Sequence, residues 1–356
     1  MKRMRVAIVG GVGIWGRYYL RAYHLHPECE IVALVDTARE RRQEFAVRYG
    51  INRVYDRVED LLADEVPDIV AASVPVKANA PIVHASIDAG VKVVSCEKPI
   101  AANLAEADRM VDHASRAGVS FACGTALYEV PFMSEIATWA ADTIAPFTAA
   151  VIPAGIREQV SGLGCVLFTF LRMITRAEVA WVQGATTPPE AAHMPEDCGA
   201  YGILGMSNGI ECRLPSPDEP HVPAIPLSVE GANGRLWLTR PRPVLISGTG
   251  LWASPVFPDF MDRIGARQTK DMFIGLADDL VACARSGGEA PCSGHDYRQG
   301  LEIAVALKLS AANGGERVDL PLRERDIDLL PVPYRMHGGD VVGWSAINQT
   351  EPTPIE

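Results

Sequence analysis

The sequence predicts an α/β domain with a doubly wound parallel sheet, followed by an α+β domain with a large, mostly antiparallel open sheet. At 356 residues the chain is longer than a single hydrophobic core usually allows. The first 125 residues alternate strand and helix patterns with short connections, which is typical of a parallel sheet covered by helices on both faces. Beyond residue 126, strand patterns are joined by Gly, Asn and Pro turns, which favour antiparallel pairing.

The elements of the first domain follow from its apolar runs and its glycines. Strands are expected over 5–9, 31–36, 68–75, 91–97 and 120–125, and helices over 38–49, 78–89 and 104–117. The glycines that follow these helices, where a left-handed cap is expected, are Gly50, Gly90 and Gly118.

The second half of the chain has fewer helical patterns. Its strand-like segments are 178–187, 203–214 and 227–239, with a hairpin turn at Gly231-Ala-Asn-Gly234, and its helices are expected over 272–285 and 297–312. We therefore expect one domain over 1–125, a second over 126–330 and an extended C-terminal arm over 331–356, which is rich in Pro and Gly.

Composition and charge exclude several classes of protein. A formal net charge of -11 argues against nucleic-acid binding, which needs a basic surface to displace counterions from phosphates. The eight cysteines form neither a C-x-x-C pair nor a zinc-site spacing, so separate reduced thiols and no metal site are expected. No apolar run reaches the roughly 20 residues of a membrane helix, and the N-terminal run is too short for a signal peptide. The expected location is the cytoplasm.

The strongest local signal is Gly11-Val-Gly13-Ile-Trp-Gly16, which directly follows an apolar strand and opens a helix. In that context the first glycine permits a tight turn, the second lets the backbone approach a pyrophosphate, and the third lets helix and strand pack closely. The phosphates then bind the amides at the helix N-terminus. This pattern predicts a Rossmann domain that binds a nicotinamide dinucleotide; the alternative is a glycine turn that binds nothing.

Asp36 ends the second strand, twenty residues beyond Gly16. A carboxylate there accepts hydrogen bonds from the adenosine ribose and repels a 2′-phosphate, which favours NAD over NADP. Arg39 and Arg41 follow it closely and leave NADP open as the second choice.

A lysine follows the strand that ends at Cys96-Glu97-Lys98-Pro99. The carboxyl ends of parallel strands open onto the ligand crevice, so Lys98 is expected to face the cofactor. Oxidation of an alcohol needs a group that accepts the hydroxyl proton. A lysine beside a cationic nicotinamide is a candidate, because like charge and partial burial disfavour the ammonium form. The alternative is a surface lysine before a turn-forming proline.

Together these motifs resemble the Gfo/Idh/MocA oxidoreductases, the group of glucose-fructose oxidoreductase and inositol dehydrogenase. The resemblance covers most of the chain. Its further segments are 73–75, 89–90, 104–108, Gly124, Pro131, Arg157, 161–164, 310–314 and 318–321.

The resemblance implies a role for individual residues of this sequence. It implies that the pyrophosphate turn is formed by Gly11, Gly13, Ile14, Trp15 and Gly16, that Asp36 holds the ribose, that Ser73, Pro75 and Asn79 lie along the cofactor, and that Glu97 contacts the nicotinamide ribose. Lys98 would be the catalytic lysine, in contact with both cofactor and substrate. Tyr128 stands where an arginine is common, and Arg157 matches an arginine of the substrate cleft. The second domain would supply substrate contacts and a dimer or tetramer interface through its sheet.

One departure from the family pattern affects the chemistry. The family usually has Asp, His and Asp on one helix, at places that hold Phe168, Arg172 and Thr175 here. An arginine stays protonated, so Arg172 cannot be a general base, although it can bind a carboxylate or stabilise an alkoxide if it faces the cleft. Proton transfer then falls to Lys98, with help from Tyr128 or from a histidine elsewhere. His193 is the first candidate and His221 the second.

These observations lead to three hypotheses about function. The first is a dehydrogenase or reductase that moves hydride between nicotinamide and a carbinol carbon of a polyhydroxylated substrate, such as a sugar, a sugar derivative or a cyclitol, with Lys98 as the proton-transfer group. The second is an NAD-dependent glycosidase or lyase that uses transient oxidation and elimination. The third is a cofactor-binding protein without turnover.

Overall fold

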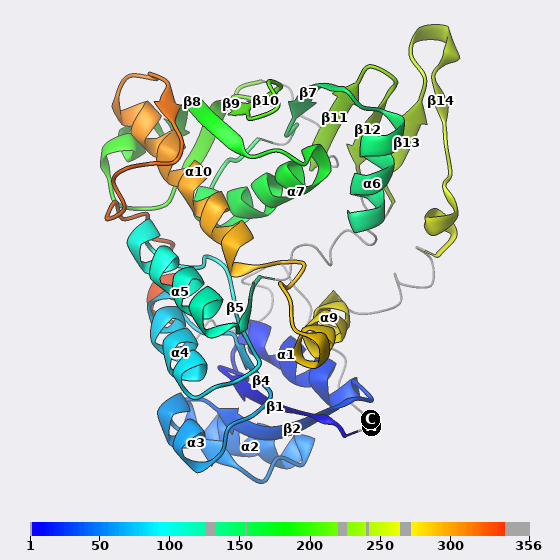
Figure 1. Cartoon of the computed structure of the whole chain (residues 1–356). Helices are drawn as coiled ribbons and strands as arrows, with labels where there is room; N and C mark the ends of the chain where they lie inside the picture. Colours follow the sequence, from blue (N-terminus) through cyan, green and yellow to red (C-terminus); the bar gives the residue numbers. More distant parts are fainter. Residues whose placement is uncertain are drawn as a thin grey trace. The chain divides into compact units, whose positions relative to one another are not determined.

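The computed structural model describes residues 2–124, 133–153, 155–219, 226–239, 242–263 and 272–338 (Figure 1). The chain divides into two compact units. The first unit is made of Met1–Tyr128, Asp271–Arg298 and Pro333–Glu356, and the second of Glu129–Lys270 and Gln299–Val332. The units are therefore discontinuous in sequence, which differs from the three consecutive segments expected above.

The first unit contains a six-stranded parallel sheet with the strand order β3-β2-β1-β4-β5-β6. Its strands are β1 (Met4–Val9), β2 (Cys29–Val35), β3 (Val54–Tyr55), β4 (Ile69–Ala72), β5 (Val93–Cys96) and β6 (Ser120–Cys123). Every residue of β4, β5 and β6 is buried, as expected for strands covered on both faces. This is the doubly wound α/β fold that the sequence predicts.

The helices of this unit are α1 (Ile14–Leu25), α2 (Arg39–Tyr49), α3 (Val58–Asp64), α4 (Val76–Asp88), α5 (Leu104–Ala117), α9 (Met272–Ser286) and α11 (Pro333–His337). Three of them, α2, α4 and α5, begin and end close to the expected positions, whereas α3 and α11 were not expected. Gly50 and Gly118 end α2 and α5 in the left-handed conformation, as predicted. Asn103 caps α5 by accepting a hydrogen bond of 3.0 Å from the backbone N–H of Glu106.

Helix α9 belongs to the first unit, although its sequence position suggested the second domain. Its Phe273 is buried and stacks on Tyr18 of α1, with ring centroids 4.9 Å apart. Leu276 and Leu280 enter the same core as Ile8 of β1. The apolar face of α9 is thus completed by the Rossmann helix α1, which explains why a segment distant in sequence folds with it.

The C-terminal segment also differs from the expected extended arm. Residues 333–337 form α11, which packs against α4. Pro333 stands at the first helical position, where its fixed φ favours a helix start. Residues 339–356 lie outside the described part of the chain.

The second unit contains a nine-stranded sheet that is antiparallel except for the parallel pair β7 and β10. In sheet order the strands are β14 (Ser254–Pro255), β13 (Val244–Ser247), β12 (Gly234–Leu238), β11 (Leu227–Gly231), β7 (Phe147–Val151), β10 (Glu211–Leu214), β9 (Gly199–Met206), β8 (Val179–Thr187) and β15 (Val318–Asp319). The predicted hairpin at Gly231–Gly234 joins β11 to β12. The segment 203–214 forms two strands, because Asn208 and Gly209 make a tight turn between them.

Helices cover this second sheet. They include α6 (Met133–Thr143), α7 (Cys165–Thr175) and, from residue 299 onward, α10 (Gly294–Ala312). A single π-helical turn, Val160–Gly164, leads into α7. Helix α7 is buried at every position but Met173 and packs against α6 and β11, so it is part of the core of this unit.

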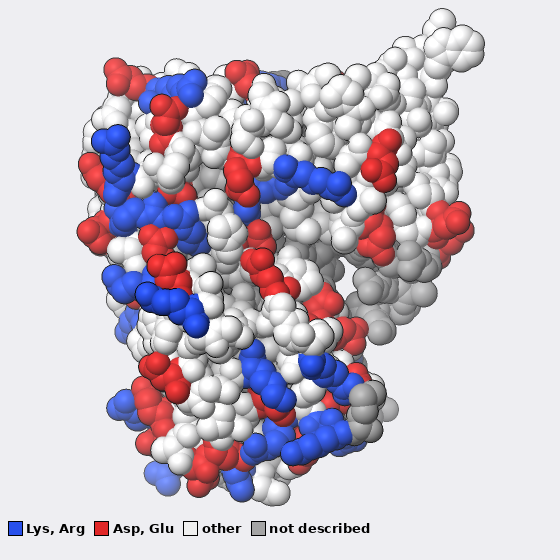
Figure 2. Space-filling model, in the orientation of Figure 1, with Lys and Arg blue, Asp and Glu red and all other residues white. Residues whose placement is uncertain are grey.

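The surface, the cysteines and the helices add three observations. On the face shown in Figure 2, Lys and Arg side chains are interspersed with Asp and Glu side chains, so this face offers no broad basic surface. All eight cysteines are buried free thiols. Among the described residues, no helix combines the length and the apolar character that crossing a membrane would demand.

Candidate functional site

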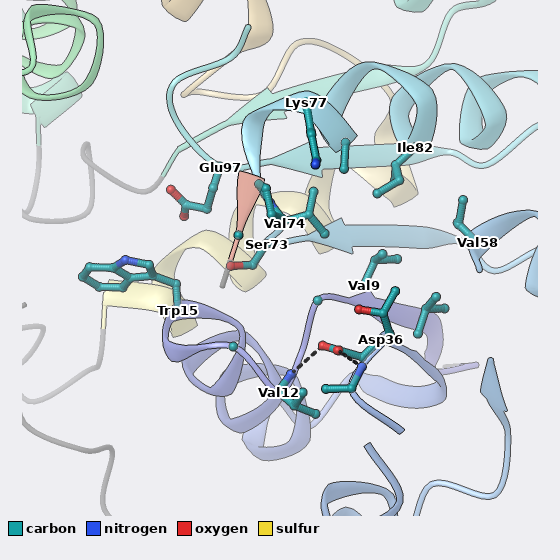
Figure 3. A pocket seen from close by; sticks show the side chains of 18 of the residues that line it. Val9, Val12, Trp15, Asp36, Val58, Ser73, Val74, Lys77, Ile82 and Glu97 are labelled. Carbon is teal, nitrogen blue, oxygen red and sulfur yellow. Dashed lines mark hydrogen bonds between the residues drawn. The ribbon is translucent and has the colours of Figure 1, made fainter. Parts of the chain in front are cut away.

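A cavity of about 890 Å³ opens at the carboxyl ends of the first sheet's strands (Figure 3). It is lined by residues that follow β1, β2, β4 and β5. Strand β1 lies between β2 and β4 in the sheet, so the strand order reverses here. In open α/β sheets such a reversal leaves a crevice in which ligands bind. In Figure 3, Glu97, Trp15 and Ser73 lie toward one end of the cavity, and Val58 and Ile82 toward the other.

The glycine turn forms the floor of this cavity, and its glycines have different tasks. A Cβ on Gly16 would lie 2.0 Å from the carbonyl oxygen of Gly10, so only glycine allows α1 to approach β1 this closely. A Cβ on Gly11 would lie 2.6 Å from Leu34 Cδ1, in the core. Gly13, in contrast, lines the cavity and precedes α1 without any side-chain cap. The amides at the start of α1 therefore suit an anion.

Gly10 belongs to this turn and was missed by sequence reasoning. Its φ is +78°, and a Cβ there would lie 2.2 Å from the carbonyl oxygen of Ser73. The signal that could have found it is its place directly after β1, where the chain must turn sharply. Through this contact, the turn after β1 and the segment after β4 form adjacent walls of the cavity.

Asp36 is held in one orientation by two backbone amides. Its Oδ2 accepts from the Val12 N–H at 3.2 Å, and its Oδ1 accepts from the Ala38 N–H at 2.9 Å (Figure 3). Asp36 also lines the cavity beside the glycine turn. A carboxylate fixed in this way is suited to accept hydrogen bonds from a ribose diol.

Arginines contribute to the lining of the cavity as well. Arg41 and Arg57 line the cavity, whereas Arg39 does not. Arg57 also donates to Glu59 at 3.3 Å. Arg42 is buried and supports the loop instead, through hydrogen bonds to the carbonyl oxygens of Asp36 and Tyr55. Arg57 was missed because it precedes α3, a helix that the sequence did not reveal.

The segment after β4 supplies Ser73, Pro75 and Lys77 to the lining, but not Asn79. Asn79 is fully buried. Its Nδ2 donates to the carbonyl oxygens of Glu97 and Pro99, both at 3.1 Å, and of Ile100 at 3.2 Å. The Asn79 amide is thus directed to the backbone and not into the cavity lining, so its expected place along the cofactor stays a prediction. Asn79 is a positioning residue for the segment that carries Lys98.

Glu97 is oriented from two sides. The buried Tyr19 Oη donates to Glu97 Oε1 at 2.6 Å, and the Lys98 N–H donates to Glu97 Oε2 at 3.2 Å. Burial, and then the negative charge of Glu97, raise the pKa of Tyr19 well above its usual value. The tyrosine therefore stays a hydrogen-bond donor throughout the physiological pH range.

Lys98 lines the same cavity as Gly13, Ile14 and Trp15. It is half-buried and precedes a cis peptide bond to Pro99. The structure thus brings together the glycine turn, Asp36 and the strand-end lysine that the sequence singled out separately.

The remaining predicted site residues lie in the second unit or outside the described residues. Arg172 is 7% exposed, and its Nε and Nη2 donate to the two carboxylate oxygens of Glu178 at 2.6 and 2.7 Å. Its guanidinium is therefore engaged in a bidentate ion pair. Arg157 and His193 are exposed, His193 at the end of a short 3₁₀ helix, Pro189–His193. Tyr128 and His221 lie outside the described residues.

Comparison with known proteins agrees with this geometry. Residues 4–125 match the GFO_IDH_MocA family of oxidoreductases with an NAD-binding Rossmann fold. D-apiose dehydrogenase of Paraburkholderia graminis is 26% identical over 341 residues, which is 88% of this chain and 89% of that protein. Myo-inositol 2-dehydrogenase of Thermotoga maritima is 28% identical over 116 residues, 33% of this chain and 34% of that enzyme.

Solved structures share the fold over nearly the whole chain. Aldose-aldose oxidoreductase from Caulobacter crescentus superposes with a TM-score of 0.72 at 20% identity, covering 90% of this chain and 100% of that one. The WlbA dehydrogenase from Bordetella pertussis, solved with NADH and UDP-GlcNAcA, gives a TM-score of 0.71 at 18% identity, covering 90% and 99%.

Fold and site together define an NAD-binding oxidoreductase. Residues 4–125 match the NAD-binding Rossmann fold of the Gfo/Idh/MocA oxidoreductase family, and the similarity to D-apiose dehydrogenase extends over 88% of the chain. The residues present fit the cofactor, since an uncapped helix N-terminus, a glycine that leaves the backbone open and a fixed carboxylate stand along one cavity.

Proposed function

We propose that this protein transfers hydride between NAD(H) and a carbinol carbon of a sugar, a sugar derivative or a cyclitol, with Lys98 as the proton-transfer group. The observation that carries the proposal is the position of Lys98, which lines the cavity that Gly13 and Asp36 also line. Oxidation of an alcohol needs a group that accepts the hydroxyl proton close to the nicotinamide. A lysine at a strand end, beside the residues that hold the dinucleotide, stands in that position.

Each residue of the site then has a distinct task. The cofactor, when bound, supplies the hydride acceptor or donor. The amides before α1 hold the pyrophosphate, and Asp36 holds the adenosine ribose. Glu97, fixed by Tyr19, orients the nicotinamide ribose. Lys98 Nζ accepts the substrate hydroxyl proton during oxidation and returns it during reduction.

Named relatives support the substrate class. D-apiose dehydrogenase, myo-inositol 2-dehydrogenase and D-glucoside 3-dehydrogenase of Escherichia coli are each named for a polyhydroxylated substrate. The candidates for substrate contact are Arg157, Tyr128 and His193, with Tyr128 or His193 relaying the proton. The Arg172 guanidinium is paired with Glu178 instead.

The test is an activity screen with both cofactors. Purified protein is mixed with NAD⁺ or NADP⁺ and a panel containing D-apiose, other aldoses, glucosides and myo-inositol, and nicotinamide absorbance at 340 nm is followed. The proposal expects turnover of at least one member of the panel, faster with NAD⁺. Silence across the panel with cofactor shown to be bound would argue against it and favour the hypothesis of a binding protein without turnover.

A second reaction class deserves the same assay, because the place of the usual family histidine holds Arg172, paired with Glu178. A site with altered proton handling suits transient oxidation followed by elimination, as in an NAD-dependent glycosidase or lyase. That reaction would cleave a glycoside without net NADH formation and would exchange the neighbouring C–H with D₂O. Net NADH formation without cleavage or exchange would exclude it.

We also infer that the protein forms a homodimer or homotetramer through the second sheet. Near the β13–β14 edge, Leu251, Trp252 and Phe257 are each more than three-quarters exposed, an uncommon arrangement for large apolar side chains. Light scattering after gel filtration tests the assembly, and a monomer at micromolar concentration would contradict it.

The eight cysteines form no disulfide, which suits a reducing compartment, and we propose the cytoplasm.

A further inference from the structure

The C-terminal helix α11 contributes to the wall of the cofactor cavity. Tyr334, Arg335, His337 and Gly338 line the same cavity as Gly13. These residues follow the last segment of the second unit, Gln299–Val332, yet they belong to the first unit. Residues 334–338 thus contribute to the same cavity as the glycine turn.

Close contacts place α11 beside the segment that follows β4. Gly338 has a φ of +75°, and a Cβ there would lie 2.7 Å from Pro75 Cγ. Its N–H donates to the Tyr334 carbonyl oxygen at 3.0 Å, which closes the helix. Pro75 follows Ser73, whose carbonyl oxygen borders Gly10 of the glycine turn. By these contacts α11 adjoins the segment next to the glycine turn, where the pyrophosphate is expected.

In the part of the chain that the structure describes, Arg335 is the residue of α11 that has a buried donor without an acceptor. Its Nε is buried and has no hydrogen-bond partner within the described residues. Its guanidinium lies over the Tyr334 ring, with Cζ 5.6 Å from the ring centroid, which limits its freedom. A buried N–H without an acceptor costs free energy, and an anion in the cavity would remove that cost. A dinucleotide brings two negative charges to this part of the site.

We propose that Arg335 binds the pyrophosphate of the dinucleotide, so that α11 forms a clamp over the cofactor opposite the glycine turn. Arginine suits this role because its guanidinium presents several N–H donors to phosphate oxygens. The inference rests on the proposed function only in taking a nicotinamide dinucleotide as the ligand. Helix α11 thereby takes part in holding that ligand, a role that no local pattern in the sequence predicts.

The test compares Arg335→Gln with the wild-type full-length chain. Dissociation constants for NADH, ADP-ribose, ADP and adenosine are measured by calorimetry. Loss of a charge-assisted hydrogen bond should weaken the three pyrophosphate ligands by about tenfold or more. Adenosine, which has no phosphate, should bind unchanged. Arg323→Gln, at an exposed arginine outside the cavity lining, is the matched control and should change none of them.

Arg335→Lys keeps the charge and separates a lost ion contact from a damaged fold. It should recover part of the affinity for ADP-ribose, with a melting temperature equal to that of Arg335→Gln. Equal losses for adenosine and ADP, or affinities within twofold of wild type for all ligands, would overturn the proposal.

These measurements distinguish the clamp from the proposed function. If wild type binds NADH and Arg335→Gln does not, the clamp stands even when no sugar is turned over. If turnover requires Lys98 while Arg335→Gln binds normally, the proposed function stands and the clamp is wrong.

Discussion

Tyr19 Oη donates a 2.6 Å hydrogen bond to Glu97 Oε1, which links the first turns of α1 to the strand end that carries Lys98. The two residues are 78 positions apart, and the tyrosine is fully buried. This hydrogen bond therefore connects the helix that we propose to bind the pyrophosphate with the segment that carries Lys98.

Tyr19→Phe should loosen this connection. Removing the hydroxyl leaves Glu97 without its buried donor, so we expect a loss of about 1–2 kcal/mol in the free energy of unfolding, and weaker NADH binding. Urea unfolding and NADH titration measure the two effects. Tyr23→Phe, one turn further along α1, is the matched control. The Tyr23 hydroxyl is buried without a hydrogen-bond partner in the described structure, so its removal should be neutral or stabilising. Equal destabilisation by both variants would contradict the role of Glu97.

Two glycines of the turn should respond differently to alanine. Gly16→Ala drives a Cβ to 2.0 Å from a backbone oxygen, and we expect it to destabilise the fold by about 3 kcal/mol. At Gly13 a Cβ meets only the Gly10 carbonyl oxygen, at 3.5 Å, which is ordinary contact. Gly13→Ala should therefore fold normally and bind NADH about tenfold more weakly, since the methyl group enters the cradle. Thermal melts and fluorescence titration separate the outcomes, and unchanged NADH affinity in Gly13→Ala would place the pyrophosphate elsewhere.

Asp36 should set the preference between the two cofactors. Asp36→Asn removes the negative charge and keeps an acceptor oxygen for one of the two amides, Val12 or Ala38, while Arg41 and Arg57 remain in the lining. The ratio of the NADPH to the NADH dissociation constant should fall by about tenfold, because a 2′-phosphate is no longer repelled. A ratio that stays at the wild-type value would show that the ribose end lies away from Asp36.

Arg172 should act on stability rather than on catalysis. Both Arg172→Met and Glu178→Gln break the bidentate pair, and each should lower the free energy of unfolding by about 1–3 kcal/mol. Neither should change KM for the substrate found in the screen. A raised KM with unchanged stability in Arg172→Met, but not in Glu178→Gln, would instead support the substrate role that the sequence suggested.

The features that could be predicted from the sequence are those that short local patterns define. Three site features could be predicted because each directly follows an apolar strand that is recognisable in the sequence. They are the glycine turn, Asp36 and Lys98. The parallel sheet followed from the alternation of apolar strands and helices. The hairpin at Gly231–Gly234 was equally local, since its turn residues stand together in the sequence.

The features that could not be predicted from the sequence depend on contacts between segments that are distant in the chain. Phe273 packs on Tyr18 from more than 250 positions away, so α9 could not be assigned to the first unit by pattern. The family resemblance implied that Asn79 lies along the cofactor, but its side-chain amide donates to three backbone carbonyl oxygens that follow β5. The same holds for Arg335, whose position in the cavity depends on the return of the chain to Pro75.

The most direct measurement compares Lys98→Met with wild type in both NADH affinity and turnover of the substrate found in the screen. Methionine keeps much of the side-chain volume but cannot exchange a proton. The account predicts an NADH dissociation constant within a fewfold of wild type and a kcat lower by about 100-fold or more. Lys92→Met, at the exposed lysine before the same strand, should leave both unchanged. Turnover by Lys98→Met at the wild-type rate would contradict the central claim.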